Sequence, residues 1–186
     1  MAFIKLIFSI FSLAMLITMI VSFIMIVKFT IVQHRLNFRK KQYIKKSFPK
    51  LTKKDLKYRQ IKIFNYQQLY LNSGFKHNLQ MTALIGSFIG MIAMFIIALF
   101  TKDVNLSFVL LSLTFCLISI FILTQPSLKE RNSFWNDYLE KHPDNPLNVC
   151  SFPLDLDEKA YENERKLGLY SLIFAVSLFV VSFIGN

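Results

Sequence analysis

The chain has few of the residues that break helices or carry negative charge. Its 186 residues include only five Gly, five Pro and eleven acidic residues, whereas 54% of them are hydrophobic. Four segments contain no Asp, Glu, Lys, Arg or His, and they cover residues 6–27, 80–100, 106–124 and 168–184. Uncharged apolar segments of this length are typical of transmembrane helices. Inside lipid each must be helical, because only a helix satisfies its own backbone polar groups.

The absence of charge at membrane depth also limits the function. Proton relays and ion-coupled transporters place ionisable groups inside their spans, where these groups mark the pathway. No pair of interrupted spans indicates the inverted repeats of secondary transporters. A transporter acting alone is therefore disfavoured, and a small transporter or channel component remains an alternative.

Motifs for catalysis and cofactor binding are missing as well. The sequence has no phosphate loop, nucleophile elbow, paired metal motif or dinucleotide fingerprint. Its two cysteines, Cys116 and Cys150, are interpreted as free thiols. We predict no catalytic residue, no metal ligand and no cofactor, and we favour a non-enzymatic protein. A membrane enzyme would need catalytic groups within 125–167, where His142, Asp144 and Glu158 are the candidates.

The predicted fold is an all-α, polytopic membrane protein with one four-span domain over residues 1–186. Spans 80–100 and 106–124 are separated by about five residues, which predicts a central helical hairpin. The first span resembles a signal peptide, but its apolar run is longer than usual and no small-x-small cleavage pattern follows it. We therefore expect it to be a retained transmembrane helix.

The first polar block, residues 28–79, is strongly basic. It holds fourteen Lys and Arg residues and a single acid, Asp55. Three interpretations are open: contact with anionic lipid headgroups, which we favour, docking of an acidic partner protein, and binding of nucleic acid, which we do not expect. The residues assigned to headgroup or partner contact are Arg39, Lys40, Lys41, Lys45, Lys46, Lys53 and Lys54.

Capping signals predict short helices in both polar blocks. Thr52, followed three residues later by an acid, starts a helix that we expect to lie on the lipid headgroups. The second block, residues 125–167, has nine acids and six bases and is acidic-leaning. Ser127 and Glu130 form a capping box that starts a helix ending near Lys141. Another helix opens near Asp155 and is expected to continue into the last span.

Charge asymmetry predicts the orientation. Loops rich in Lys and Arg stay on the cytoplasmic side, so block 28–79 is placed inside. The turn near Lys102 is then outside, block 125–167 is inside, and both termini are outside. In a bacterium this corresponds to the inner membrane.

Small residues recur on one face of three spans. Such faces let helix backbones approach closely in lipid, and Gly86-x-x-x-Gly90 is the sharpest example. We expect the small face of span 80–100 to meet that of span 106–124, or a partner. The predicted helix-packing residues are Ala83, Gly86, Gly90, Ala93, Ser112, Cys116, Ser119, Gly168, Ser171 and Ala175.

These features favour a small, non-enzymatic integral inner-membrane protein. We interpret it as an accessory or scaffold subunit that associates laterally with a larger membrane complex. The expected partners are anionic lipids and other membrane subunits or a second copy of the chain. An alternative function is that of a bacterial immunity-type membrane protein that protects against a pore-forming toxin.

Overall fold

The computed structural model describes residues 2–72, 74–101 and 103–184, and these residues form α-helices and no strand. Four of the helices are long and apolar enough to cross a membrane, which confirms the predicted all-α class with four spans. The helices are α1 (Ala2–Ser47), α2 (Lys53–Tyr70), α3 (Phe75–Phe100), α4 (Val104–Leu123), α5 (Leu128–Lys141) and α6 (Leu154–Ile184).

Helix α1 is much longer than the predicted span. It does not end near residue 27 but continues through the first part of the basic block to Ser47. No Gly or Pro interrupts this stretch, and the helix ends just before Phe48, which precedes Pro49 and is thereby biased away from helical geometry. At 1.5 Å per residue, α1 is about 69 Å long. It therefore extends well beyond a hydrocarbon core of about 30 Å.

Both predicted helix starts are present, and each of them is a capping box. The Thr52 hydroxyl accepts a hydrogen bond from the Asp55 amide at 3.2 Å, and the Asp55 carboxylate accepts one from the Thr52 amide at 2.9 Å. Ser127 and Glu130 form the same pair of bonds at the start of α5. Hydrogen bonds from the capping residues lower the pKa of the Asp55 and Glu130 carboxyls. The ionised carboxylates therefore stabilise both helix starts at neutral pH.

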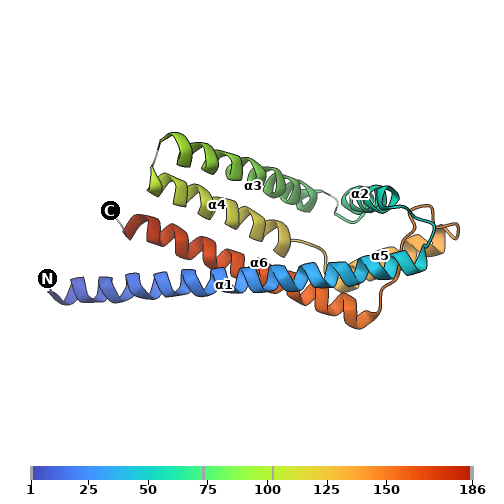
Figure 1. The fold of residues 1–186 in the computed structure, drawn as a ribbon, viewed down its shortest axis with the longest axis horizontal. Coiled ribbons are helices and arrows are strands. Elements are labelled where there is room, and N and C mark those ends of the chain that lie inside the picture. The colour runs from blue at the N-terminus through green and yellow to red at the C-terminus, as the bar shows by residue number, and fades with distance from the viewer. Residues whose placement is uncertain (1, 73, 102, 185–186) are drawn as a thin grey trace.

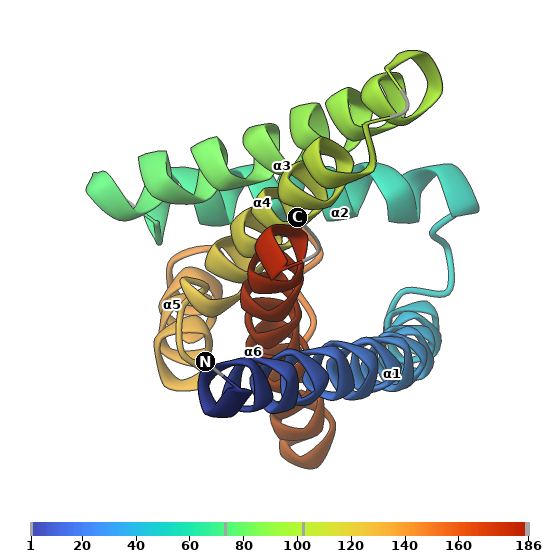
Figure 2. The same cartoon turned by 90° about the vertical axis from the view of Figure 1, so that its left-hand side faces the viewer.

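The membrane helices form an open bundle in the spatial order α1, α6, α4, α3. Helix α6 packs against α1 on one side and against α4 on the other, and α3 packs against α4 (Figure 2). The start of α1, the end of α6 and the turn between α3 and α4 lie together at one end of the molecule (Figure 1). Helices α2 and α5 lie at the other end, and α2 runs across the direction of the spans. We call this second end the polar end.

Polar side chains join the helices where the apolar segments stop. The Asn163 amide on α6 donates to the Phe29 carbonyl oxygen of α1 at 2.9 Å and to the Gln33 side chain at 2.8 Å. Arg165 donates to the carbonyl oxygens of Leu123 and Gln125 at the end of α4. A cation near the last carbonyls of a helix satisfies free acceptors and complements the helix dipole. These bonds fix the bundle at the base of the polar end.

Candidate functional site

The predicted small face of α3 packs against α4 within the chain. A Cβ atom built on Gly90 would lie 2.5 Å from the Thr114 hydroxyl oxygen, and one on Gly86 would lie 3.0 Å from a methyl carbon of Leu117. Ala83 on the same face is buried and Ala93 is half-buried. The glycines thus allow α3 and α4 to approach more closely than larger residues would permit.

The predicted small face of α4 meets α6 instead. The Ser112 hydroxyl donates to the Ala175 carbonyl oxygen at 2.7 Å, and the Ser119 hydroxyl donates to the Gly168 carbonyl oxygen at 2.7 Å. A Cβ atom on Gly168 would lie 2.9 Å from side-chain atoms of both Ile122 and Leu123. The remaining predicted residues on these helices are Ser171, which is buried, and Cys116, which is half-buried.

The two small faces of α3 and α4 are therefore not in contact with each other. Thr114 and Leu117 form the side of α4 that meets α3, and the serine side lies against α6. A periodic pattern marks a face of a helix, but it does not specify which neighbour covers that face. The structure assigns the faces to separate interfaces inside the chain.

The predicted contact residues of the basic block are mostly free of ion pairs. Only Lys40 is engaged, in a salt bridge of 2.6 Å with Asp157 on α6. The other six are exposed and form no salt bridge within the described part of the chain. Because α1 stays helical, Lys45 lies about 25 Å along the helix from the end of the apolar segment. That separation exceeds two Debye lengths at physiological salt.

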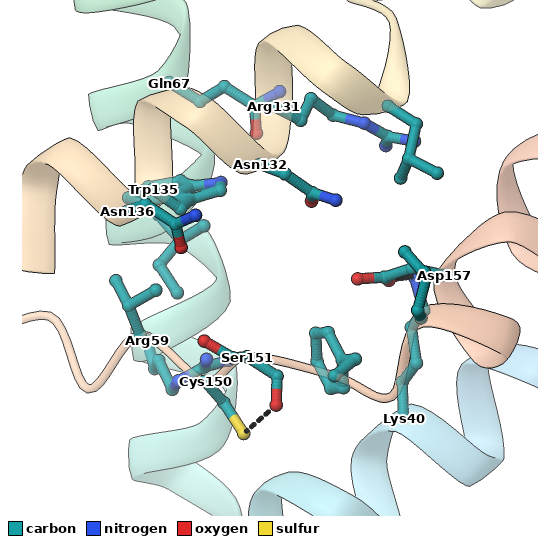
Figure 3. A pocket seen from close by; sticks show the side chains of 15 residues that line it. Lys40, Arg59, Gln67, Arg131, Asn132, Trp135, Asn136, Cys150, Ser151 and Asp157 are labelled. Carbon is teal, nitrogen blue, oxygen red and sulfur yellow. Dashed lines mark hydrogen bonds and ion pairs between the residues drawn. The ribbon is translucent and has the colours of Figure 1, made fainter.

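A cavity of about 340 Å³ lies at the polar end between α1, α2, α5, α6 and the segment before α6 (Figure 3). We call it the polar-end cavity. Its walls combine cationic, amide and aromatic side chains. The lining residues are Lys40, Arg59, Ile63, Gln67, Leu128, Arg131, Asn132, Trp135, Asn136, Val149, Cys150, Ser151, Phe152, Leu154 and Asp157.

Arg59 is the unusual residue of this cavity. Its side chain is buried, with only 8% of the residue exposed, and its Nε donates to the Asn148 carbonyl oxygen at 2.7 Å. Among the described residues it has no carboxylate partner. Burial lowers the pKa of Arg59, while the neighbouring Cys150 sulfur acts in the opposite direction. An arginine nevertheless remains charged at neutral pH.

The other two cations of the cavity are neutralised by acids on α6. Lys40 pairs with Asp157, and its ammonium group also lies 5.1 Å from the centre of the Phe152 ring. Arg131 lies 3.6 Å from the Glu164 carboxylate. The acidic-leaning block thus pairs with the basic residues of α1 and α5, and only Arg59 is left without a counter-charge.

Aromatic rings fix the wall of the cavity formed by α5. Tyr66 of α2 contacts Phe134, Trp135 and Tyr138 of α5, with ring centres 5.2 to 6.1 Å apart. Tyr138 is buried, and its hydroxyl oxygen accepts a hydrogen bond from the Leu147 amide at 3.3 Å. Burial raises the pKa of Tyr138. This cluster holds α2 and α5 together across the cavity.

The residues considered for catalysis do not line this cavity. His142 stacks on Tyr138, with its Nδ1 atom 3.0 Å from the Tyr138 carbonyl oxygen. Asp144 and Glu158 are exposed. In the described segments no group of three His, Cys, Asp or Glu side chains is arranged to hold a metal ion.

Arg59 is not among the residues predicted from the sequence, although the sequence contains a signal for it. Leu56, Arg59 and Ile63 recur at spacings of three and four on α2, so the arginine falls on the apolar side of that helix. A charged residue on an apolar face is the kind of exception that marks a buried polar site.

Comparison with known proteins adds no family to this description. The chain matches no protein-family model, and it has no significant match among curated proteins or solved structures.

Proposed function

We propose that this protein is a non-enzymatic membrane protein that associates laterally with other membrane proteins, as an accessory or scaffold subunit of a larger complex. The observation that supports this is an exposed stripe of aliphatic residues on α1. The stripe repeats at alternating spacings of four and three, and its members are 44–60% exposed. The α1 stripe comprises Leu6, Ile10, Leu13, Ile17, Ile20, Ile24, Val27 and Ile31.

The stripe lies on the side of α1 opposite α6. Each residue of a helix turns by about 100°, which places the α1 stripe about half a turn away from Ser22 and Leu36. Ser22 and Leu36 are buried, and Leu36 belongs to the core cluster that includes Leu156 and Ala160 of α6. Alternating spacings of four and three keep one seam facing a partner helix in a left-handed coiled coil. The geometry of the stripe therefore suits a second apolar helix in the bilayer.

Other surfaces suit a lateral partner less well. The small faces of α3, α4 and α6, where helices approach closely in lipid, are already covered within the chain. Of residues 6–27 on α1, only Ser22 is buried. Helices α1 and α3 are the two edge spans of the bundle (Figure 2), and both expose large apolar side chains. We place the lateral contact on α1 because its exposed aliphatic residues form one regular stripe.

The basic residues of the polar end are proposed to contact an acidic surface of the same partner complex. Arg39, Lys45 and Lys53 are exposed and have no salt bridge within the described residues. Their separation from the apolar segment favours an acidic protein surface over lipid headgroups for the more distant lysines. Headgroup contact is retained for the residues nearest the membrane, beginning at Lys28.

Site-specific photo-crosslinking in membranes tests the lateral contact. A photoreactive residue at Leu13 or Ile20 lies on the α1 stripe, and the matched controls Ala14 and Val21 lie one residue further and about 100° around the helix. We expect a discrete adduct with another membrane protein, or with a second copy, from the two stripe positions and much less from the controls. Equal adducts at all four positions, or adducts with lipid alone, would contradict the proposal.

The polar end is proposed to face the cytoplasm, as the excess of Lys and Arg predicts. Cys150 lies at that end and is half-buried, while Cys116 lies within α4. In intact cells, a membrane-impermeant thiol reagent is expected to spare Cys150 and to label it after permeabilisation. Labelling of Cys150 in intact cells would reverse the assigned orientation.

A further inference from the structure

We propose that the polar-end cavity binds a phosphate-bearing anion through the guanidinium group of Arg59. This binding site is independent of the lateral contact proposed for α1. It is argued from the charge, the hydrogen bonds and the size of the cavity.

The charge argument rests on the missing counter-ion of Arg59. A charge with little exposure is normally paired in proteins, because losing contact with water is costly for an unpaired ion. No Arg59 nitrogen is among the fully buried, unpartnered side-chain atoms of the described residues, so the terminal nitrogens remain accessible. Lys40 and Arg131 have carboxylate partners at 2.6 and 3.6 Å, but Arg59 has only a backbone carbonyl oxygen. An anion in the cavity would pair with the one cation of its lining that has no carboxylate partner among the described residues.

A second cavity beside Arg59 adds positive potential. It lies between α1 and α2, is lined by Lys41, Lys53, Lys57 and Arg59, and contains no acidic residue. Arg59 therefore belongs to both cavities, and the three lysines are exposed around it. A concave surface lined by charge of one sign focuses the field and attracts the opposite charge.

The hydrogen bonds of Arg59 leave a suitable fork of donors. A guanidinium carries five N–H donors in a plane, and the terminal pair matches two oxygens of a phosphate. The only hydrogen bond that Arg59 makes with the described residues uses Nε. Ser151, Asn132 and Asn136 line the same cavity and carry further hydroxyl and amide donors (Figure 3).

The size of the cavity restricts the ligand. Its volume of about 340 Å³ lies at the lower end of the range for small-molecule sites. It accommodates a small phosphate ester or a lipid headgroup, but not acyl chains. The shared chemistry is the phosphate, and its source is either a soluble ester or a membrane lipid.

The chain contains its own reporter for this test. Trp135 is the only tryptophan and lines the cavity. With the full chain in nanodiscs of phosphatidylcholine alone, inorganic phosphate is expected to change the Trp135 emission saturably and to raise the thermal midpoint. Chloride at the same ionic strength is expected to do neither. The proposal is overturned if phosphate changes neither the Trp135 emission nor the thermal midpoint and if phosphatidylglycerol discs do not change the emission either.

Variants of Arg59 link the response to the site. Arg59→Gln is expected to weaken phosphate binding by about tenfold or more, because charge-assisted bidentate contacts are lost. The phosphate affinity of Arg59→Lys is expected to lie between those of the wild type and Arg59→Gln, since an ammonium keeps the charge but lacks the paired donors of the guanidinium. Lys62→Gln removes the same charge from α2 at a residue that lines neither cavity, and it should bind like the wild type.

The folding of each variant is checked by its helix content and by its thermal midpoint without phosphate. If Arg59→Gln does not fold, Arg59→Lys carries the test, and wild-type affinity in that variant contradicts the proposal. Equal responses in Arg59→Gln and the wild type also overturn it.

A second set of nanodiscs identifies the source of the phosphate. Transfer of the chain into discs that contain phosphatidylglycerol, with no added phosphate, is expected to leave the emission unchanged if the ligand is soluble. An emission change that Arg59→Gln abolishes identifies a lipid headgroup as the ligand and supports the same site. An emission change that persists in Arg59→Gln contradicts the site.

Discussion

The membrane half and the polar end of this protein are held together by different contacts, although α1 and α6 run through both. Between α3, α4 and α6 the contacts are mainly glycines against side chains and serine hydroxyls against backbone carbonyls, and one ring pair, Phe115 with Phe174, joins α4 to α6. At the polar end, α2 and α5 meet through a cluster of aromatic rings, and ion pairs connect α1 and α5 to α6.

The difference follows from the solvent on each side of the boundary. In lipid, burial of apolar groups gives no driving force between helices, so close backbone approach and hydrogen bonds decide the packing. In water, burial of large rings drives association and the exposed charges remain solvated. A substitution should therefore destabilise mainly the half in which it lies. The size of the loss should depend on the kind of contact that it removes.

The largest effect is expected at Tyr138. Tyr138→Ala removes a ring that is only 4% exposed together with its hydrogen bond from the Leu147 amide. By analogy with truncation of buried aromatic residues, we expect a loss of about 3–5 kcal/mol at the polar end. Chemical denaturation followed by Trp135 emission measures this loss, because the two rings are in contact. Tyr58→Ala, on the exposed side of α2, is the control.

This experiment also tests whether the two halves are separable. We expect the helix content of the membrane spans to persist when the Trp135 transition has moved. Simultaneous loss of both signals in Tyr138→Ala would show that one cooperative unit covers both halves.

A smaller effect is expected between α3 and α4. Gly90→Leu forces a side chain against Thr114 and should cost about 1–3 kcal/mol without preventing membrane insertion. Gly86→Leu should cost less, because the atom it meets is the flexible end of Leu117. Unfolding by denaturing detergent in mild micelles measures both. Ala98→Leu on the exposed side of α3 serves as the control, and an equal loss there would remove the distinction between the faces.

The smallest effects are expected between α4 and α6. Ser112→Ala and Ser119→Ala each remove one interhelical hydrogen bond, and each should cost about 0.6 kcal/mol. Ser107→Ala is the matched control, because that hydroxyl donates to the carbonyl oxygen of Asp103, the N-cap residue of the same helix, and joins no second helix. The same detergent assay compares the three variants. A loss in Ser107→Ala as large as in the other two would show that these hydroxyls do not join the helices.

Much of the local structure was readable from the sequence. Four uncharged apolar segments predicted four membrane-length helices, and the residues around Thr52 and Ser127 predicted two helix starts that the structure contains. The length of α1 was underestimated at the sequence level, although the absence of Gly and Pro before Pro49 was a visible indication. The regular spacing of the α1 stripe is visible in the sequence, but only the structure shows that these side chains are exposed.

The sequence by itself thus determined the helices, because length, hydropathy and capping act between residues that are near in the chain. Only the tertiary structure decided which helix each face meets, since Ser112 and Gly90 look alike as small-face residues but face α6 and α4 respectively. It also decided that Arg59 alone, of fourteen basic residues in the block, is buried without a carboxylate. Pairing and burial depend on neighbours far apart in sequence, and periodicity carries no information about their identity.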